Sequence, residues 1–531
     1  MTSFNRFSGL RQYASQHAMR VVLTLASTAS LAPTSVLWSQ TPQTPTGAAV
    51  SLSLADALRM ATGASESIGL AQAGAQRAQG QQLQARSAMM PQLATSLAWT
   101  KTLQNQFEAI TRQSNSGNNN GGGADTTAEN PITRIFASPY NTTFGITASQ
   151  PLYTGGRAAA GVRAARIGRE SAEIGITSAK AQVQLDVTQA YYDAVLTDRL
   201  VQIAESSLVQ SERTLRQVQL TRSVGSASEF ELIRARVTRD NQRPSWLQSR
   251  TNRDLAYVRL HQLLNLPLDR ALSLSDGIVE AAAPAGVNTP SAPITTVNVS
   301  SAEVLTIDPS VRAEVSRVLA STDTSAKTRA PVRQALKGVE QAQQQLKATK
   351  SQWRPSITAT SNYQRLAYPD NGLPSALSDF FPNWTAGVGI SFPFFTGGRV
   401  KGEVLAAEAT VKEAELRLQQ AEEGAALDAR NSVAQLEQAE AAWQASVGTA
   451  EQATRSYDIA EVRFREGIST QLELSETRVQ LQQALANRAK AARDLQVARV
   501  RLQLLRDLPL AGGSAQSTGT GSGTSTPGNT P

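Results

Sequence analysis

Apolar residues alternate with small or polar ones in four short segments of the chain. The alternation is clearest in WTAGVGISF (384–392) and weaker in TFGITASQ (143–150). PQLATSLAWT (91–100) and PSITATSNYQ (355–364) supply partner segments, each opening with a proline. A period of two predicts a strand with one apolar face. We therefore expect two hairpins whose strands are about nine or ten residues long, enough for a tilted strand to cross a bilayer.

A helical pattern follows each hairpin. Helix-forming residues such as Ala, Gln, Leu, Arg and Glu dominate from about 157 to 222 and from about 399 to 465. Each predicted helix of ~65 residues is roughly 100 Å long, which no compact domain needs. Gly225 and Gly467 suit the ends of these helices, and returning helices run to LNLPL and RDLPL, where a proline ends them. The helices alone are equally compatible with a long antiparallel coiled coil.

The turns and joints between these elements have recognisable residues. Ser228, and either Ser469 or Thr470, can cap the returning helices. Each strand meets its long helix in a shared motif, SQPLYTGGR or SFPFFTGGR. We expect the proline to end the strand and the glycine pair to permit the turn. The joint residues are Pro151, Gly155 and Gly156 in the first motif and Pro393, Gly397 and Gly398 in the second.

The two motifs belong to an internal repeat. Pro393 lies 242 residues after Pro151, and the same offset relates Gly467 to Gly225. Upstream, Pro355 lies 264 residues after Pro91, so the first copy is 22 residues longer there. The Asn/Gly-rich tract SNSGNNNGGGADTT (114–127) supplies most of the difference and is expected to be a solvent loop. Internal repetition indicates two copies of one structural unit.

The composition fits a thin helical protein that is exported. The 531 residues are 40% hydrophobic but only 5% aromatic. Basic residues without an acid, then VVLTLASTASLA (21–32), indicate a secretory signal peptide over residues 1–40. A basic arm on a cytoplasmic protein is the alternative. No other segment approaches ~18 uninterrupted apolar residues.

The same composition leaves little material for catalysis or cofactors. There is no cysteine, which excludes disulfides, thiolate metal sites and cysteine nucleophiles. Outside the leader His261 is the only histidine, so no triad or multi-histidine metal site is expected. The net charge of +8 is spread over mixed-sign helices, which argues against nucleic-acid binding. We expect neither an enzyme nor a protein with a cofactor.

Four strands per chain pose a problem that one chain cannot solve. They are too few to close a barrel, and an open sheet edge is not tolerated in lipid. Several chains must then share one barrel under cyclic symmetry. Two chains would give eight strands and three would give twelve, and the strand pattern does not choose between them.

The order of these motifs resembles that of the TolC family of outer-membrane efflux and secretion proteins. The resemblance covers about residues 52–510. It is carried by LSLADALRMA (52–61), the two TGGR joints, the turns VGSASEFEL (224–232) and EGISTQLELSE (466–476), and the LNLP and RDLP helix ends.

The resemblance implies a mainly α fold with a membrane β-barrel part. It implies a homotrimer in outer-membrane lipid, with four strands from each chain in a shared twelve-stranded barrel and a long α-helical barrel that extends into the periplasm. Such a protein is a passive, gated duct for small molecules or proteins. Its partners are a periplasmic adaptor (membrane fusion protein) and an inner-membrane RND or ABC transporter. The alternative is a periplasmic or surface coiled-coil scaffold without a pore.

The resemblance also divides the chain. We expect a signal peptide (1–40), a first structural repeat (41–270), an equatorial linker (271–325) with a helix near 301–320, a second structural repeat (326–510) and a disordered C-terminal tail (511–531).

In the TolC family the periplasmic gate lies at the second helical turn and carries an acidic ring. Glu473 and Glu476 occupy these positions, three residues apart on one helix face. Six such carboxylates around a threefold axis would favour cations. The alternative is an ordinary solvated helix start, where glutamate favours the positive end of the helix dipole.

The family's closed gate is further held by a Tyr and an Arg linked to the first hairpin. Phe464 and Ser469 stand at these positions, and Glu231 is the carboxylate of the first hairpin. Phe464 has no hydroxyl and Ser469 no charge, so other contacts, such as those of Arg463 or Arg465, are expected to replace this latch. The expected adaptor contacts are the exposed turn residues Val224, Gly225, Ser226, Gly467, Ile468 and Ser469, although the glycines serve turn geometry equally well.

Overall fold

The computed structural model describes the greater part of the chain. The described residues are 50–103, 139–268, 270–277, 309–320, 322–369, 372–374 and 376–510. The chain divides into a unit of residues 1–48 and a unit of residues 49–531, and all described residues belong to the second. The expected signal peptide, the Asn/Gly-rich tract, residues 278–308 of the expected linker and the expected tail lie outside the described residues.

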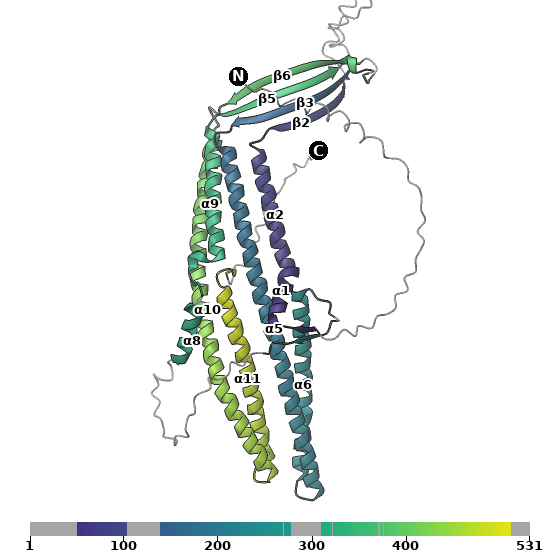
Figure 1. Cartoon of the computed structure of the whole chain (residues 1–531), viewed down its shortest axis with the longest axis vertical. Helices are drawn as coiled ribbons and strands as arrows, with labels where there is room; N and C mark the ends of the chain where they lie inside the picture. Colours follow the sequence, from purple (N-terminus) through teal and green to yellow (C-terminus); the bar gives the residue numbers. More distant parts are fainter. Residues whose placement is uncertain are drawn as a thin grey trace, which may run out of the picture. The chain divides into compact units, whose positions relative to one another are not determined.

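Two long helical hairpins dominate the described part (Figure 1). Helix α5 (Arg157–Ser223) and helix α10 (Arg399–Arg465) each have 67 residues, close to the predicted bounds. They return as α6 (Glu229–Leu264) and α11 (Gln471–Leu504). Ser228 and Thr470 cap the returning helices through their side-chain oxygens, so Thr470 rather than Ser469 is the second cap.

Shorter helices extend the two hairpins toward the strands. Helix α2 (Glu66–Ser87) follows α1 (Leu54–Ala64) and packs on α5, and α9 (Ala330–Lys350) packs on both α5 and α10. Helix α11 packs on α5, which joins the two hairpins. Many buried positions on α5 and α10 are alanine, for example Ala190, Ala194 and Ala450. Small side chains let the backbones approach closely, so long helices stabilise one another without a thick core.

The four predicted strands form one antiparallel sheet. They are β2 (Gln92–Lys101), β3 (Tyr140–Tyr153), β5 (Ser356–Ala367) and β6 (Phe380–Ser391). The order is β2-β3-β5-β6, so the two predicted hairpins are joined through β3 and β5. Trp384 pairs with Tyr363, Tyr363 with Ile146 and Ile146 with Thr95.

This register gives the sheet one apolar and one polar face, because paired residues share a face and neighbours along a strand alternate. The mainly apolar face carries Leu93, Leu97, Trp99, Phe144, Ile146, Ile357, Tyr363, Trp384, Val388 and Ile390. Thr95 and Ser361 lie on the same face, as do Lys101 and Arg365 near the strand ends far from the helices. The opposite face carries Gln92, Ser96, Thr100, Thr143, Thr147, Ser149, Thr358, Thr360, Asn362, Gln364 and Thr385. All residues of β2 are exposed, as are nearly all of β6, so the described helices leave both faces of these strands uncovered.

The outer strands of this sheet each have one neighbour. Strand β2 pairs only with β3 and β6 only with β5 within the described part of the chain. Each edge therefore presents unpaired backbone N–H and C=O groups along its length.

The first strand-to-helix joint differs from the prediction. Pro151 does not end its strand: β3 continues to Tyr153, with a register shift between Pro151 and Tyr153. The pairing between β2 and β3 ends at the Gln92–Ser149 pair. At Pro151, strand β3 therefore has a neighbour on one side only, which is β5. A proline is tolerated at such a position because the ladder there does not need its missing N–H. Strand β6 does end before Pro393, at Ser391.

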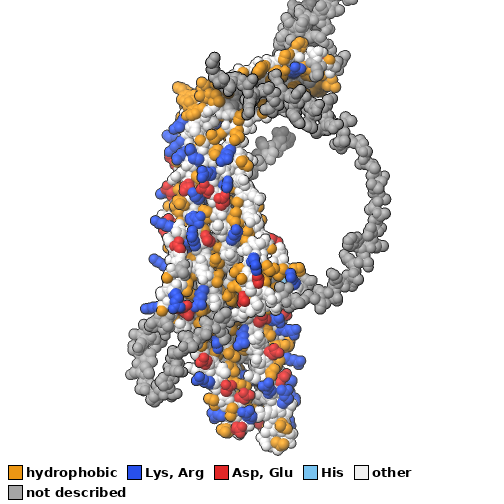
Figure 2. Space-filling model, in the orientation of Figure 1, with side chains coloured by type: hydrophobic (Ala, Val, Ile, Leu, Met, Phe, Trp, Pro, Cys, Tyr) orange, Lys and Arg blue, Asp and Glu red, His pale blue; other side chains and the backbone are white. Residues whose placement is uncertain are grey.

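The glycine pairs at both joints have left-handed backbone conformations. Gly155 and Gly156 have φ values of 65° and 96°, and Gly397 and Gly398 have 58° and 87°. A Cβ on Gly155 would also lie 2.8 Å from the carbonyl oxygen of Ser351. Figure 2 shows hydrophobic side chains gathered where the sheet meets the helices, and the exposed Phe394 and Phe395 belong to the second joint.

Two short strands that the sequence pattern did not predict help to form a core partway along the helices. Strand β1 (Val50–Leu52) pairs in parallel with β4 (Leu272–Leu274). The buried Tyr191 hydroxyl donates to the carbonyl oxygen of Leu52 at 3.1 Å and accepts from the amide of Asp276 at 3.2 Å. These bonds fix both strand ends on α5. In the second hairpin, α8 (Pro309–Ala320) covers Trp443 and Leu436 in a comparable core.

A buried arginine ties the start of α9 to the second hairpin. Arg329 is 0% exposed. Its guanidinium donates to Asp428 Oδ2 at 2.7 Å and to the carbonyl oxygens of Ala425 and Leu505, both at 3.1 Å. Ala425 and Asp428 lie on α10 and Leu505 caps the end of α11, so the arginine fixes the start of α9 to both helices of the second hairpin.

No helix within the described residues is both long enough and apolar enough to cross a membrane.

We predict that Arg329→Met lowers the free energy of unfolding by about 3–5 kcal/mol, because it breaks the buried ion pair with Asp428 and removes the donors to two buried carbonyl oxygens. Asp428 then keeps only the 3.3 Å contact with Arg501. Thermal melting of the purified protein measures the loss. The matched control is Arg417→Met, which removes an exposed i,i+4 pair with Glu413 and should change stability by less than about 1 kcal/mol. Equal melting temperatures for the two variants would contradict a structural role for Arg329.

Candidate functional site

The candidate site lies at the turns that close the two helical hairpins. Both turns have the same backbone geometry. Gly225 and Gly467 have φ values of 83° and 75°, and the amides of Ser226 and Ile468 bond back to carbonyl oxygens five residues earlier, Thr221 and Arg463, at 2.9 and 2.8 Å. This is the Schellman pattern, which satisfies the last carbonyl groups of a helix and strongly favours glycine.

An ion pair spans each turn. Arg222, at the end of α5, pairs with Glu229 at the start of α6. Arg463, near the end of α10, pairs with Glu473 on α11 at 3.3 Å. The predicted gate residue Glu473 thus has a basic partner within its own hairpin, and Arg463 is one of the residues expected to substitute for the family latch. Both pairs are largely exposed, so each adds little stability.

The other two predicted carboxylates have different surroundings. Glu231 accepts from the amide of its own cap, Ser228, at 3.0 Å, so its side chain completes a capping box. Glu476 is exposed one turn after Glu473 on α11. Glu231 therefore stabilises the start of α6, whereas Glu476 stays accessible on the surface of this chain.

Phe464 connects the two hairpins through an apolar contact. It is partly buried and packs against the cluster of Leu215, Val218, Leu232 and Ala235 in the first hairpin. It also packs against Tyr457, Ala460 and Leu474 in the second. Ser469, the other predicted latch position, has a buried hydroxyl with no hydrogen-bond partner among the described residues.

Gln471 makes a second contact between the hairpins, which sequence reasoning missed. With its amide oriented to satisfy both atoms, its nitrogen donates to the carbonyl oxygen of Glu231 at 3.1 Å and its oxygen accepts from the amide of Ala235 at 3.0 Å. Its burial could not be read from the sequence, because Gln471 sits in a polar turn motif. Together Phe464 and Gln471 fix the start of α11 against α6.

The turns also present apolar side chains to the surroundings. Val224 is 71% exposed and Ile468 is 70% exposed. Figure 2 shows hydrophobic side chains at the lower end of the helices, where these turns lie. Each turn thus exposes one branched apolar side chain.

Comparison with known proteins identifies the class of protein. A family model described as outer membrane efflux protein matches residues 57–266 and 323–506. The chain belongs to this family. The match confirms the family resemblance found in the sequence. It also confirms the prediction that this is an efflux protein of the outer membrane.

Solved structures share the fold of this outer membrane efflux protein. VceC from Vibrio cholerae has 18% identity and a TM-score of 0.62, covering 85% of this chain and 95% of its own. The CmeC channel of Campylobacter jejuni has 15% identity and a TM-score of 0.64, covering 86% and 85%. The open state of the MtrE channel of Neisseria gonorrhoeae has 18% identity and a TM-score of 0.60, covering 86% and 89%. No curated protein matches the chain in sequence.

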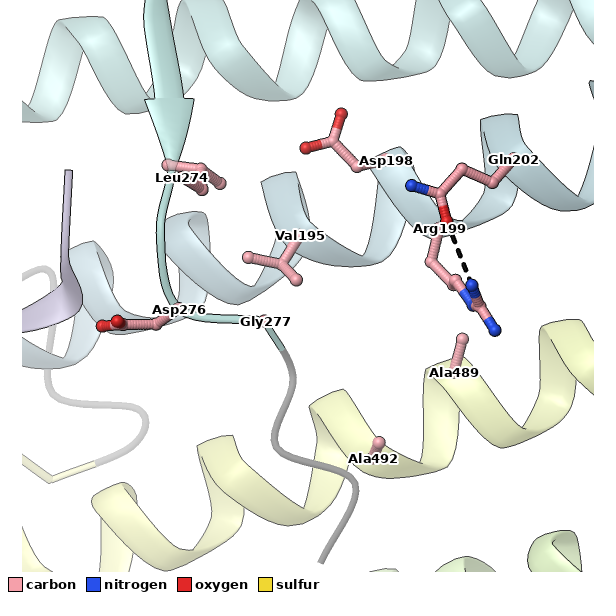
Figure 3. Close-up of a pocket in the computed structure, with 9 residues that line it drawn as sticks. All are labelled: Val195, Asp198, Arg199, Gln202, Leu274, Asp276, Gly277, Ala489 and Ala492. Carbon is pink, nitrogen blue, oxygen red and sulfur yellow. Dashed lines mark hydrogen bonds between the residues drawn. The ribbon is translucent and has the colours of Figure 1, made fainter. Parts of the chain in front are cut away.

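A cleft near the middle of the helices is lined by carboxylates that already have hydrogen-bond or ion-pair partners. It measures about 400 Å³ and lies between α5, the segment after β4 and α11 (Figure 3). Asp198 accepts from the Tyr257 hydroxyl at 2.6 Å and pairs with Arg253 at 2.8 Å. Asp276 accepts from the amide of Leu54 at 2.8 Å. Burial, with the hydrogen bond to Asp198, raises the pKa of Tyr257. No group of three or more metal-ligating side chains occurs within the described residues.

We predict that Phe464→Ala loosens the two turns, because it removes the apolar contact between the hairpins at a cost of about 1–3 kcal/mol. Amide hydrogen exchange in the peptides around residues 224–235 and 464–481 should become faster. Val224→Ala, at an exposed position of the same region, is the matched control and should leave exchange unchanged. If both variants exchange like the wild type, Phe464 does not hold the hairpins together.

Proposed function

We propose that this outer membrane efflux protein is one subunit of a passive, trimeric, gated duct. The observation that carries the proposal is the sheet, with its apolar face, its polar face and its two unpaired edges. In the hydrocarbon of a membrane each unpaired backbone group costs several kcal/mol, so both edges need partners. Pairing β6 of one copy with β2 of the next provides them.

Three copies would give twelve strands, with the apolar faces toward lipid and the polar faces around a lumen. Eight strands from two copies would leave an interior that side chains fill. A duct for efflux requires the larger number. The long helices of three copies, packed side by side, would continue the lumen as an α-helical barrel into the periplasm.

We further propose that the hairpin turns form the periplasmic gate and the docking surface. Exposed Val224 and Ile468, with Gly225, Ser226 and Gly467 shaping the turns, suit contact with a periplasmic adaptor that links the duct to an inner-membrane transporter. The family description names efflux, which favours a drug- or metabolite-exporting pump over type I protein secretion. Both an RND and an ABC transporter are compatible with these turn residues.

In the proposed gate, Glu473 and Glu476 from three copies form the acidic ring. The Arg463–Glu473 pair, the Phe464 contact and the bond from the Ser469 amide to the Arg463 carbonyl oxygen at 3.3 Å hold the second turn in place. Because Phe464 contributes only apolar contact, opening would separate packed side chains and break no buried ion pair in this region. A closed ring of like charges also repels itself, which lowers the cost of opening.

We predict discrete, cation-favouring conductance steps when the purified protein is inserted in a planar bilayer. Glu473→Gln with Glu476→Gln should shift the reversal potential toward that of a non-selective pore, because the double variant removes the acidic ring. Glu466→Gln, an exposed position before the second turn, is the matched control and should keep the selectivity of the wild type.

If the protein gives no conductance and carbonate extracts it from membranes, the result supports the pore-free coiled-coil scaffold instead. Conductance with unchanged selectivity in the double variant would retain the duct and place its gate elsewhere.

A further inference from the structure

A second cleft lies between α5 of the first hairpin and α11 of the second, and its lining is basic and polar. Its volume is about 110 Å³. The polar lining residues are Arg199, Gln202, Ser206, Ser207, Gln210, Arg478 and Gln482. Neither Asp nor Glu contributes to the lining. The cleft therefore holds two guanidinium groups and no carboxylate.

Arg478 is the unusual member of this cleft. It is only 5% exposed, and its Nε has no hydrogen-bond partner among the described residues. A smaller cavity that Arg478 also lines, of about 10 Å³, again has no acidic residue in its lining. A buried charge without a partner is strongly unfavourable, so it is normally paired or neutralised.

The surroundings of Arg478 do not supply the missing negative charge. Burial lowers the pKa of Arg478, but an arginine side chain stays protonated in proteins. Its neighbour Tyr457 could carry a charge only as a phenolate. Burial raises the pKa of Tyr457 to about 12, so its hydroxyl is neutral at physiological pH. The buried cation thus lacks a counter-charge within the described part of the chain.

Other donors in the cleft are also available. Gln202 Oε1 accepts from Arg199 Nη1 at 3.0 Å, so the amide N–H groups of Gln202 are left to donate. The single proton of the Ser207 hydroxyl has two acceptors in reach, Gln242 Oε1 at 3.3 Å and Gln482 Oε1 at 3.4 Å, and the side-chain amide of Gln482 adds two further N–H groups. Guanidinium and amide N–H groups around a small space are the donors that an anion requires.

We propose that this cleft binds a small inorganic anion, from chloride to phosphate in size, between the guanidinium groups of Arg478 and Arg199 and the glutamine amides. The cleft is much smaller than the roughly 300–1,000 Å³ of a site for a drug-sized molecule, so it is distinct from any cargo site. Because α5 and α11 belong to different hairpins, a bound anion would strengthen the contact between them.

The test is thermal melting of the full-length protein in detergent, at constant ionic strength, in sodium gluconate, sodium chloride and sodium phosphate. Gluconate is too large for the cleft and serves as the reference. We expect chloride or phosphate to raise the melting temperature by roughly 2–4 °C in a saturable way. Arg478→Met should abolish this increase, and in gluconate it should melt no lower than the wild type, because it removes an unpaired buried charge.

Arg216→Met, at an exposed position of α5, is the matched control and should keep the anion effect. If Arg478→Met does not fold, Arg199→Met should weaken the effect and shift its midpoint to higher anion concentration. The proposal is overturned if wild type melts equally in all three salts, or if Arg478→Met retains the increase. It is also overturned if Arg478→Met disrupts the oligomer without any dependence on anion, since an acidic side chain of a second copy would then be the partner.

Discussion

The structure depends on a four-stranded sheet whose two edges have no neighbouring strand within the described part of the chain. Its four strands leave two edges with unpaired backbone groups, and both faces of its edge strands are uncovered. The register places most of the large apolar side chains on one face and most of the polar ones on the other, so one face suits lipid and the other suits water. For a family whose members work in the outer membrane, closure with further copies satisfies the edges and both faces together.

The helices follow from the same requirement. If copies close into a ring at the sheet, every helix that leaves the ring must run alongside its neighbours for its full length. Helices α5 and α10 have equal lengths, and both begin directly after a glycine pair in left-handed conformation. Small buried residues along these helices allow close lateral packing. The buried Arg329 bonds to α10 and to the end of α11, and so holds the start of α9 against the second hairpin. At the far ends, Phe464 and Gln471 join the two hairpins of one chain.

Most of the element boundaries could be predicted from the sequence because local signals set them. Alternation marked the four strands, and glycine pairs and single glycines marked the starts and ends of both long helices. Pro151 was misjudged, because its tolerance depends on where β2 ends, which is a property of the neighbouring strand. The pairing of β1 with β4 joins residues far apart in the sequence and gives no local pattern.

The sequence predicted the two helical turns but not the contacts made there. The turn glycines follow from the repeat, whereas the family resemblance pointed to Glu473 and Phe464. Their partners follow from how the hairpins pack: Arg463 reaches Glu473 across the turn, Glu231 caps its own helix, and Gln471 inserts against α6. The burial of Arg478 without a counter-charge has no sequence signal at all, because an arginine on a polar helix is ordinarily a solvated residue.

Disulfide crosslinking between β2 and β6 tests most directly whether neighbouring copies complete the sheet. The chain has no cysteine, so Ser96→Cys combined in turn with Asn383→Cys, Thr385→Cys or Gly387→Cys reports only on the introduced pair. The account predicts that at least one pair gives covalently linked dimers and trimers on non-reducing gels of outer membranes, whereas Ser96→Cys alone stays monomeric. Monomers for every pair, in protein that is folded and located in the outer membrane, would contradict it.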